Sequence, residues 1–237
     1  MKNMVILGAG AAGTMMVRHL NRKLDKKDWS ITVIDEYPKH YYQPGFLFIP
    51  FGVYSEKHVV KDKKKFIPKN VRFLLESIER IDPQSNKVKL KSGQDIDYDI
   101  LIIATGAKIV PEEVEGLLGD GWRNNIFDFY TLEGSLALHD KLKTWKGGKL
   151  AIHLTEMPIK CPIAPLEFTL LADWFLTKRG IRKEVELTYV TPLSGAFTKE
   201  NCSNVLGHML GEKEINLVKD FSLGRVDGSG NKLVRFD

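Results

Sequence analysis

The stretch that decides the fold of this chain is MVILGAGAAG at residues 4–13. Its first four residues are apolar and predict a buried strand, and its three glycines have the spacing GxGxxG. Residues 11–24 then have helical patterning, and residues 31–34 are β-branched and lead into Asp35. Strand, tight turn, helix and strand within about 30 residues form a βαβ unit, which is the context that a dinucleotide-binding turn needs.

Each residue type in this turn has a physical task. Gly8 permits a sharp turn, Gly10 lets a diphosphate approach the backbone, and Gly13 allows the helix to pack closely on the strand. The first amides of the helix face the phosphates. Asp35 lies 22 residues beyond Gly13, where an acidic side chain can accept hydrogen bonds from ribose hydroxyls. The residues predicted to contact the nucleotide here are Gly8, Gly10, Ala11, Ala12, Gly13, Asp35 and Glu36.

Two further motifs select the cofactor, because the glycines alone do not distinguish FAD from NAD. Residues 100–103 predict an aliphatic strand that is buried on both faces and runs into Ala104, Thr105 and Gly106. That combination resembles a strand late in the FAD domain of the flavoproteins with two dinucleotide-binding domains. The loop at residues 41–45 follows the second strand, where such folds approach the flavin ring. We therefore expect FAD as the cofactor, and the residues predicted to contact it outside the glycine turn are Gln43, Pro44, Ala104, Thr105 and Gly106.

The rest of the chain predicts a second α/β segment. Between residues 111 and 125 the composition changes to glycine, acidic residues and turn formers, which suggests a crossing between domains. The predicted fold class is α/β, with a Rossmann-like FAD-binding domain at residues 1–111 and a second, incomplete Rossmann-like domain at residues 112–237. The other expected elements are strands at 71–75, 149–154 and 185–190, helices at 136–145 and 165–179, and hairpins at 87–98 and 221–236.

Composition and charge exclude several classes of protein. The chain has 237 residues, of which 43% are hydrophobic and 27% charged, so we expect a folded globular protein. The net charge of +5 is spread along the chain. The densest basic run, residues 61–65, contains no aromatic residues that would stack on bases, so we expect a solvated loop and no nucleic-acid partner. With only Cys161 and Cys202, we expect no disulfide framework and no metal site.

The first residues and the hydropathy pattern bear on location. A strand that starts within four residues of Met1 leaves no room for a signal peptide, so we expect a cytoplasmic protein. No stretch approaches the roughly 18 apolar residues of a spanning helix. Membrane contact is therefore expected to be peripheral.

The segment TEMPIKCP at residues 155–162 carries the reactive chemistry. It follows a predicted strand at the place where a second glycine turn would hold NAD(P)H, but its prolines remove amide donors. The helix that follows Cys161 and the neighbouring Lys160 both favour a thiolate, which could attack sulfur or pass electrons to the flavin. Glu167, six residues further on, is the candidate proton acceptor. The alternatives are a buried structural thiol for Cys161 and an ordinary surface carboxylate for Glu167.

Three stretches together resemble the sulfide:quinone oxidoreductases and the flavocytochrome c sulfide dehydrogenases. They are YQPGFLFIPFG at residues 42–52, ATG at 104–106 and KCPIAPLE at 160–167. The resemblance spans nearly the whole chain. It implies an FAD-dependent enzyme that oxidises sulfide toward polysulfur and passes electrons to quinone. It also implies that Cys161 is the first of two sulfur-handling cysteines and that Glu167 matches an acidic residue proposed as a base.

The chain departs from this family in identifiable places. Some members carry a third cysteine in the segment equivalent to residues 127–132, where this chain has Tyr130 and Thr131, so covalent flavin attachment is not expected. The second redox cysteine, a further FAD-binding Gly-Asp motif and C-terminal membrane-binding helices lie in a later region that this sequence does not contain. Cys202 does not match that second cysteine, and we expect a structural or surface thiol in a polar loop.

The sequence is thus expected to be the N-terminal portion of a longer, homo-oligomeric enzyme that contacts the membrane through the missing region. Two alternatives stay open. One is a type II NADH:quinone dehydrogenase, which would need a nucleotide-binding turn after Leu154. The other is a catalytically inactive fragment that holds flavin weakly or not at all.

Overall fold

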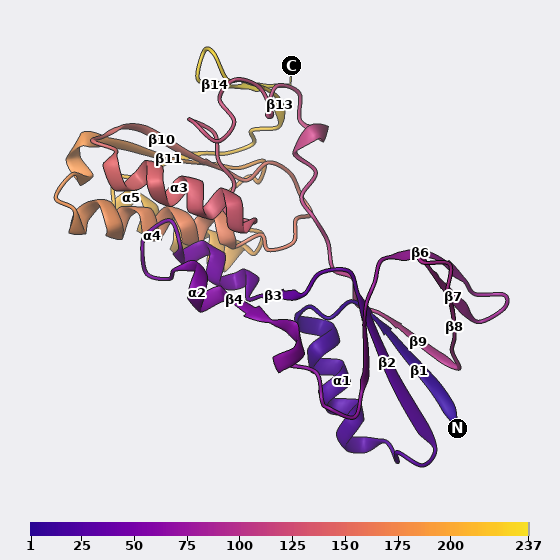
Figure 1. The fold of residues 1–237 in the computed structure, drawn as a ribbon. Coiled ribbons are helices and arrows are strands. Elements are labelled where there is room, and N and C mark those ends of the chain that lie inside the picture. The colour runs from indigo at the N-terminus through magenta and orange to yellow at the C-terminus, as the bar shows by residue number, and fades with distance from the viewer. Residues whose placement is uncertain (237) are drawn as a thin grey trace. The chain divides into compact units, whose positions relative to one another are not determined.

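A computed structural model of the chain describes residues 1–236 and contains two compact units (Figure 1). The first unit comprises Met1–Gln43 and Glu56–Ile109, and the second comprises Pro44–Ser55 together with the chain from Val110 onward. The boundary expected after residue 111 lies close to the second of these crossings. The assignment of Pro44–Ser55 to the second unit was not expected from the sequence.

The first unit is built on a parallel sheet of four strands in the order β5-β2-β1-β9. Strand β1 pairs with β2 on one side and with β9 on the other, so that Leu7 lies opposite Ile34 and Ile103. The bounds of the strands and of the helix that follows β1 are Lys2–Leu7 for β1, Ala11–Lys23 for α1, Trp29–Asp35 for β2, Arg72–Leu75 for β5 and Ile100–Ile103 for β9.

Alternation along β1 explains how this sheet is covered on both faces. Met4 and Ile6 belong to a buried cluster with Val17 of α1, whereas Val5 and Leu7 pack with apolar residues of strands β7 and β8. Successive side chains of a strand point to opposite faces, so one apolar run serves two cores. The smaller elements of this unit are β3 (Lys39–Tyr41), α2 (Glu56–Val59), β4 (Val60–Asp62), η2 (Lys63–Lys65), β6 (Ile78–Asp82), β7 (Lys87–Leu90) and β8 (Asp95–Asp97).

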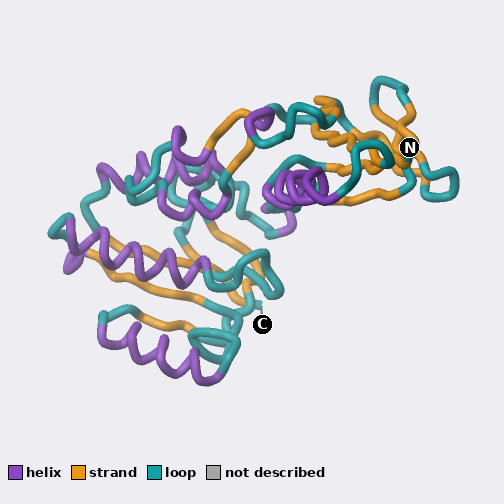
Figure 2. The backbone as a smooth tube through the Cα atoms, turned by 90° about the horizontal axis from the view of Figure 1, so that it is seen from below, coloured by secondary structure: helices purple, strands orange, loops and turns teal. Residues whose placement is uncertain are grey.

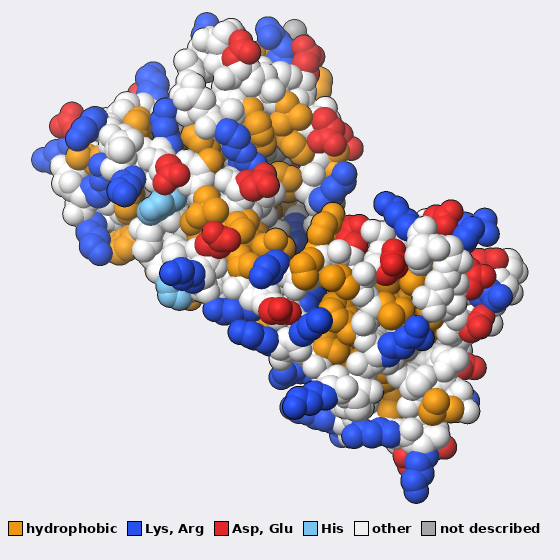
Figure 3. Space-filling view, in the orientation of Figure 1, with side chains coloured by type: hydrophobic (Ala, Val, Ile, Leu, Met, Phe, Trp, Pro, Cys, Tyr) orange, Lys and Arg blue, Asp and Glu red, His pale blue; other side chains and the backbone are white. Residues whose placement is uncertain are grey.

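The prediction that residues 100–103 are buried on both faces is wrong. Ile100 is 42% exposed and Ile103 is 62% exposed. Strand β9 is the edge of the described sheet and has β1 as its one partner there, so no neighbouring strand or helix shields its outer side. The face in Figure 3 has hydrophobic side chains at the surface of both units, among interspersed basic and acidic ones.

The second unit contains a parallel sheet in the order β10-β11-β12, with helices on both sides of its strands (Figure 2). Its main elements are α3 (Leu132–Thr144), β10 (Gly148–His153), α4 (Ala164–Lys178), β11 (Val185–Val190), α5 (Glu200–Glu212) and β12 (Asn216–Val218). The short helices η1 (Gln43–Phe48), η3 (Pro111–Glu113) and η4 (Arg182–Glu184) and the hairpin β13–β14 (Leu223–Asp227 and Lys232–Arg235) complete the described structure. The predicted α/β class is confirmed.

Helix α4 is the centre of the second core. Its residues Leu166, Phe168, Ala172 and Leu176 are buried against apolar residues of the sheet and of helices α3 and α5. Helix α5 is an element that the sequence reasoning missed, and Cys202 lies on it as an exposed residue, so the expected polar loop is wrong. None of the helices in residues 1–236 combines the length and hydropathy that a bilayer-spanning segment requires.

Candidate functional site

The glycine turn and the Ala-Thr-Gly motif lie against each other. The backbone N–H of Ala104 donates a hydrogen bond of 2.7 Å to the carbonyl oxygen of Leu7. Gly8 has a φ of +91°, and a Cβ atom there would lie 2.3 Å from the carbonyl oxygen of Ala104 and 2.9 Å from the Cα atom of Thr105. Only glycine fits this position, because both the backbone angle and the available space exclude a side chain.

The second and third glycines of the turn differ in what surrounds them. A Cβ atom on Gly13 would lie 1.9 Å from the carbonyl oxygen of Gly8, so this glycine is required by packing. A Cβ atom on Gly10 would meet nothing within 4 Å. No side chain within residues 1–236 caps helix α1 at Gly10, and Ala11 and Ala12 are exposed. Open space in front of uncapped helix amides fits the diphosphate of a dinucleotide.

Asp35 ends β2 beside this turn, as predicted, but its carboxylate already has protein partners. One oxygen accepts a hydrogen bond of 2.6 Å from the N–H of Ala9, and the other accepts one of 2.9 Å from the N–H of Tyr37 and forms an ion pair with Lys63. A carboxylate offers about four acceptor positions. Asp35 therefore fastens the strand end to the glycine turn, and its contact with a ribose hydroxyl stays a prediction.

Lys63 is a site residue that the sequence reasoning missed. It belongs to the basic run that was expected to be a solvated loop, yet it is only 5% exposed. Its N–H donates to the carbonyl oxygen of Pro38, which anchors the start of η2 and brings the side chain to Asp35. His40 was missed as well, since its Nδ1 lies 3.3 Å from the carbonyl oxygen of Ala9 in the turn. The residues next to Lys63 and His40 in the sequence do not indicate either of these contacts.

The remaining predicted cofactor residues lie at the ends of their elements. Glu36 is exposed, and its Oε2 accepts a hydrogen bond of 3.1 Å from the Oγ of Ser77. Gly106 has a φ of +76° and follows Ala104 and Thr105 after β9. Gln43 and Pro44 begin η1, and the division between the two compact units falls between them. Direct contact of these residues with a flavin stays a prediction.

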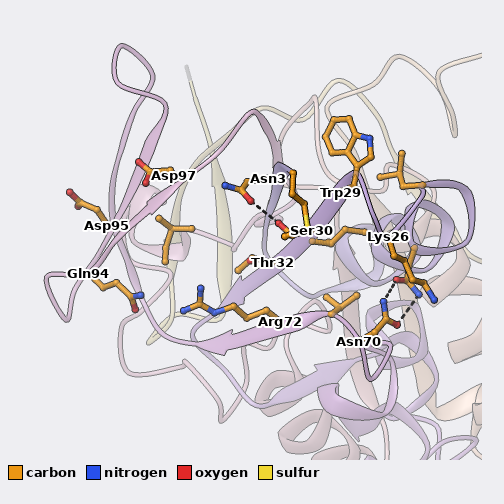
Figure 4. Close-up of a pocket in the computed structure, with 16 residues that line it drawn as sticks. Asn3, Lys26, Trp29, Ser30, Thr32, Asn70, Arg72, Gln94, Asp95 and Asp97 are labelled. Carbon is orange, nitrogen blue, oxygen red and sulfur yellow. Dashed lines mark hydrogen bonds between the residues drawn. The ribbon is translucent and has the colours of Figure 1, made fainter.

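A separate cavity of about 570 Å³ lies in the first unit (Figure 4). It is lined by Asn3 near the start of β1, Ser30 and Thr32 in the first half of β2, Arg72 at the start of β5, and Asp95 on β8. The glycine turn follows the opposite, carboxyl end of these strands, which is where ligands bind in open α/β sheets. The cavity in Figure 4 is therefore not the nucleotide site.

Cys161 lies three residues before helix α4 and is partly buried. Its carbonyl oxygen accepts two hydrogen bonds, one of 3.0 Å from the phenol of Tyr130 and one of 3.1 Å from the N–H of Ala164. Glu167 is in the first turn of α4 and is exposed. Residues 1–236 contain no group of His, Cys, Asp and Glu side chains that could hold a metal ion.

The electrostatic environment of the Tyr130 phenol includes Cys161 and Glu167. Burial raises the pKa of Tyr130 well above its usual value, and the charges of Cys161, Tyr189 and Glu167 raise that pKa further. The phenol therefore stays protonated and can donate its hydrogen bond to the Cys161 carbonyl oxygen. On the strand that precedes this segment, burial lowers the pKa of His153 to about 4.

Comparisons with known proteins agree with these features. The family model described as pyridine nucleotide-disulphide oxidoreductase matches residues 2–152. The chain is 31% identical to a mitochondrial sulfide:quinone oxidoreductase of Dictyostelium discoideum over 98% of this chain and 54% of the relative. Its structure matches that of the sulfide:quinone oxidoreductase of Aquifex aeolicus with a TM-score of 0.81 at 27% identity, covering 96% of this chain and 53% of that one.

A more limited match bears on the alternative enzyme class. A type II NADH:quinone oxidoreductase of Staphylococcus haemolyticus is 31% identical over 112 residues, which are 44% of this chain and 26% of the relative. This chain spans about half the length of the sulfide:quinone oxidoreductases that it matches. The resemblance to that family, and FAD as the cofactor of the first unit, are confirmed. The relatives that it matches over most of its length include sulfide:quinone oxidoreductases, and the chain belongs to the pyridine nucleotide-disulphide oxidoreductase family.

Proposed function

We propose that this chain is part of an FAD-dependent oxidoreductase that oxidises sulfide to polysulfur and passes the electrons to quinone. Cys161 is the sulfur-handling thiol in this proposal, and Glu167 is the proton acceptor. The likeness to sulfide:quinone oxidoreductases over 98% of the chain supports the reaction class.

The connection between β10 and α4 is the feature that supports the proposal most directly. In the second unit, the connection between β10 and α4 presents Cys161 where the first unit presents its phosphate-binding turn. Pro158 and Pro162 have no N–H to offer, and Pro165 removes another donor from the first turn of α4. This geometry disfavours a second bound dinucleotide and leaves a thiol next to a helix N-terminus.

The residues of the chain have defined tasks in such a reaction. Cys161 lies three residues before the start of α4 and next to Lys160, and it is the nucleophile of the proposal. Glu167 is exposed in the first turn of the same helix, so it can take the proton of an arriving HS⁻ and release it to water. FAD, when bound at the glycine turn, supplies a two-electron acceptor.

Electrons and atoms balance through sulfide and quinone alone. Oxidation of one HS⁻ to the level of persulfide sulfur releases two electrons and one proton. The sulfur would be held by Cys161, and FAD bound at the glycine turn would supply the acceptor for the electron pair. One quinone takes the two electrons with two protons and becomes a quinol. Each further HS⁻ that bonds to the bound sulfur releases another two electrons and one proton, and one further quinone takes these electrons.

The proposal is tested by adding sulfide to the FAD-loaded full-length protein that contains this chain and following the flavin absorbance. We expect bleaching of the band in the native protein and its loss in Cys161→Ser, with FAD still bound. Cys202→Ser is the matched control, because that thiol is exposed on α5 and should leave bleaching unchanged. Equal bleaching rates in Cys161→Ser and the native chain would remove Cys161 from the reaction.

The two alternatives give different spectra in the same experiment. Rapid bleaching by NADH but not by sulfide would identify an NADH:quinone dehydrogenase. A colourless protein that gives no shifted absorbance band with added FAD would identify an inactive fragment. Self-association and peripheral contact with the cytoplasmic membrane face, where apolar quinones are available, belong to the proposal for the longer enzyme.

A further inference from the structure

The segment between Arg123 and Gly134 is a turn with one tightly specified arrangement. Arg123 forms an ion pair of 2.6 Å with Asp128. The other oxygen of that carboxylate accepts hydrogen bonds from the N–H groups of Tyr130 and Thr131, at 3.0 and 2.8 Å. The Thr131 hydroxyl then accepts from the N–H of Gly134 and caps helix α3. A Cβ atom on Gly134 would lie 2.4 Å from the carbonyl oxygen of Asp128, so the turn leaves no room for a side chain there.

This turn is attached both to the Cys161 loop and to the helix behind it. The phenol of Tyr130 donates its hydrogen bond to the Cys161 carbonyl at 3.0 Å. The adjacent ring of Phe129 stacks on Phe168 of α4, with 4.5 Å between centroids and 19° between ring planes. Two neighbouring side chains thus connect one rigid turn to the residue before α4 and to α4 itself.

The phenol keeps its proton under all ordinary conditions. Burial raises the pKa of Tyr130, and the negative charges of Cys161 and Glu167 raise that pKa in the same direction. The phenol therefore stays a hydrogen-bond donor to the Cys161 carbonyl oxygen through the ordinary pH range.

We propose that Tyr130 is the positioning residue for Cys161. Its phenol holds the carbonyl of the loop between Pro158 and Pro162, so that the thiol stays just before the start of α4. The inference deepens the proposed function, because it concerns the same thiol. The hydrogen bond needs neither sulfide nor quinone, so it can be tested without the reaction.

The test measures the rate at which iodoacetamide alkylates Cys161 in the full chain, with Cys202→Ser removing the second thiol. We expect Tyr130→Phe to raise this rate about fivefold, the change in loop opening that follows from losing one neutral hydrogen bond. The ratio of the two rates should stay constant between about pH 6 and pH 9, because the phenol does not titrate there. Mass spectrometry of the labelled peptide reports the rate well below the melting temperature.

Tyr189→Phe is the matched control, because Tyr189 also lies close to Tyr130 but its hydroxyl does not contact the Cys161 carbonyl. It should leave the alkylation rate unchanged. Thr131→Ala, which releases the cap that orders the turn, should raise the rate in the same direction as Tyr130→Phe. A lower melting temperature of Tyr130→Phe with an unchanged alkylation rate would show a merely structural tyrosine and overturn the proposal.

The outcomes also separate this inference from the proposed function. If Cys161→Ser still allows sulfide to bleach the flavin while Tyr130→Phe accelerates alkylation, the sulfide reaction is refuted and the positioning role stands. If Cys161→Ser abolishes bleaching and Tyr130→Phe changes neither alkylation nor bleaching, the positioning role is refuted and the reaction stands.

Discussion

The two units use the same strand–turn–helix arrangement and differ in the turn. Three residues, Gly8 to Gly10, join β1 to α1, whereas ten residues, 154–163, join β10 to α4. Each first strand pairs in parallel with the next strand of its sheet. The backbone framework is therefore shared, and the residues of the turn decide whether the helix N-terminus faces a phosphate or carries a thiol.

The chemistry of each turn follows from its backbone donors. Around Gly10 the helix amides are uncapped and face open space, which suits an anionic ligand. Around Cys161 the prolines have no N–H, and the carbonyl of Cys161 is occupied by Tyr130 and Ala164. The comparison teaches that a three-residue glycine turn leaves helix amides open to an anion, whereas a ten-residue connection with prolines offers fewer amide donors and carries a thiol.

Alanine substitutions at two glycines of the first turn should differ in their effect on the free energy of unfolding, and this is the largest effect that we expect. Gly13→Ala places a Cβ atom 1.9 Å from the Gly8 carbonyl oxygen and should cost more than about 4 kcal/mol, enough to unfold the first unit. Gly10→Ala has open space and a φ of −74°, so it should fold normally. Urea unfolding measures both variants.

Gly10→Ala also tests whether the glycine turn binds the diphosphate of FAD. Because the added methyl group of Gly10→Ala points into the space of the diphosphate, FAD affinity should fall at least about tenfold, which is about 1.4 kcal/mol. Flavin fluorescence on titration with FAD reports this change. Native FAD affinity in Gly10→Ala would show that the amides of this turn do not grip the diphosphate, and the contrast between the two turns would fail.

The Lys63 ion pair should have the next largest effect. Lys63→Met leaves the Asp35 carboxylate buried without its cation, which should cost about 3 kcal/mol in the free energy of unfolding. It should also weaken FAD binding, since Asp35 holds the N–H of Ala9 in the glycine turn. Lys64→Met is the matched control, because Lys64 is exposed, and it should change stability by less than about 0.5 kcal/mol. Equal stability of the two variants would contradict a structural role for the pair.

The glycine turn was predictable from the sequence because its requirements are local. Spacing, strand periodicity and the acidic end of β2 all lie within one βαβ unit, so Gly8, Gly13 and Asp35 were recognised from patterns alone. The exposure of Ile103 was not, because an edge strand is distinguished from a central one only by the neighbours that the fold supplies.

Features that depend on distant partners were not predictable. Lys63 is buried because Pro38 and Asp35, both more than 20 residues away, receive its backbone and side chain. The contact between Tyr130 and Cys161 joins segments 31 residues apart. Helix α5 was read as a loop because its sequence is polar and contains two interior glycines, and its stability comes from packing of residues such as Leu210 on the core.

His153 should have the smallest of these effects on stability. It is the last residue of β10, as Leu7 is the last residue of β1, so it compares the ends of equivalent strands in the two units. Its Nε2 atom is buried and makes no hydrogen bond with any residue that the structure describes, and its ring packs edge-on against Phe221. Burial lowers the pKa of His153 from 6.5 to about 4. The unfolded chain therefore binds more protons than the folded one between these values.

Because the unfolded chain binds more protons, acid should lower the free energy of unfolding. The stability that His153 contributes is complete above about pH 6.5 and is lost progressively as the pH falls toward 4. Between about pH 7.5 and pH 5 the loss should be about 2 kcal/mol. His153→Leu should remove this part of the pH dependence in urea unfolding, whereas His208→Gln, which changes an exposed histidine on α5, should retain it. If His153→Leu keeps the native pH dependence, the imidazole has the same pKa in the folded and the unfolded chain, and the end of β10 is then a solvated site unlike the apolar end of β1.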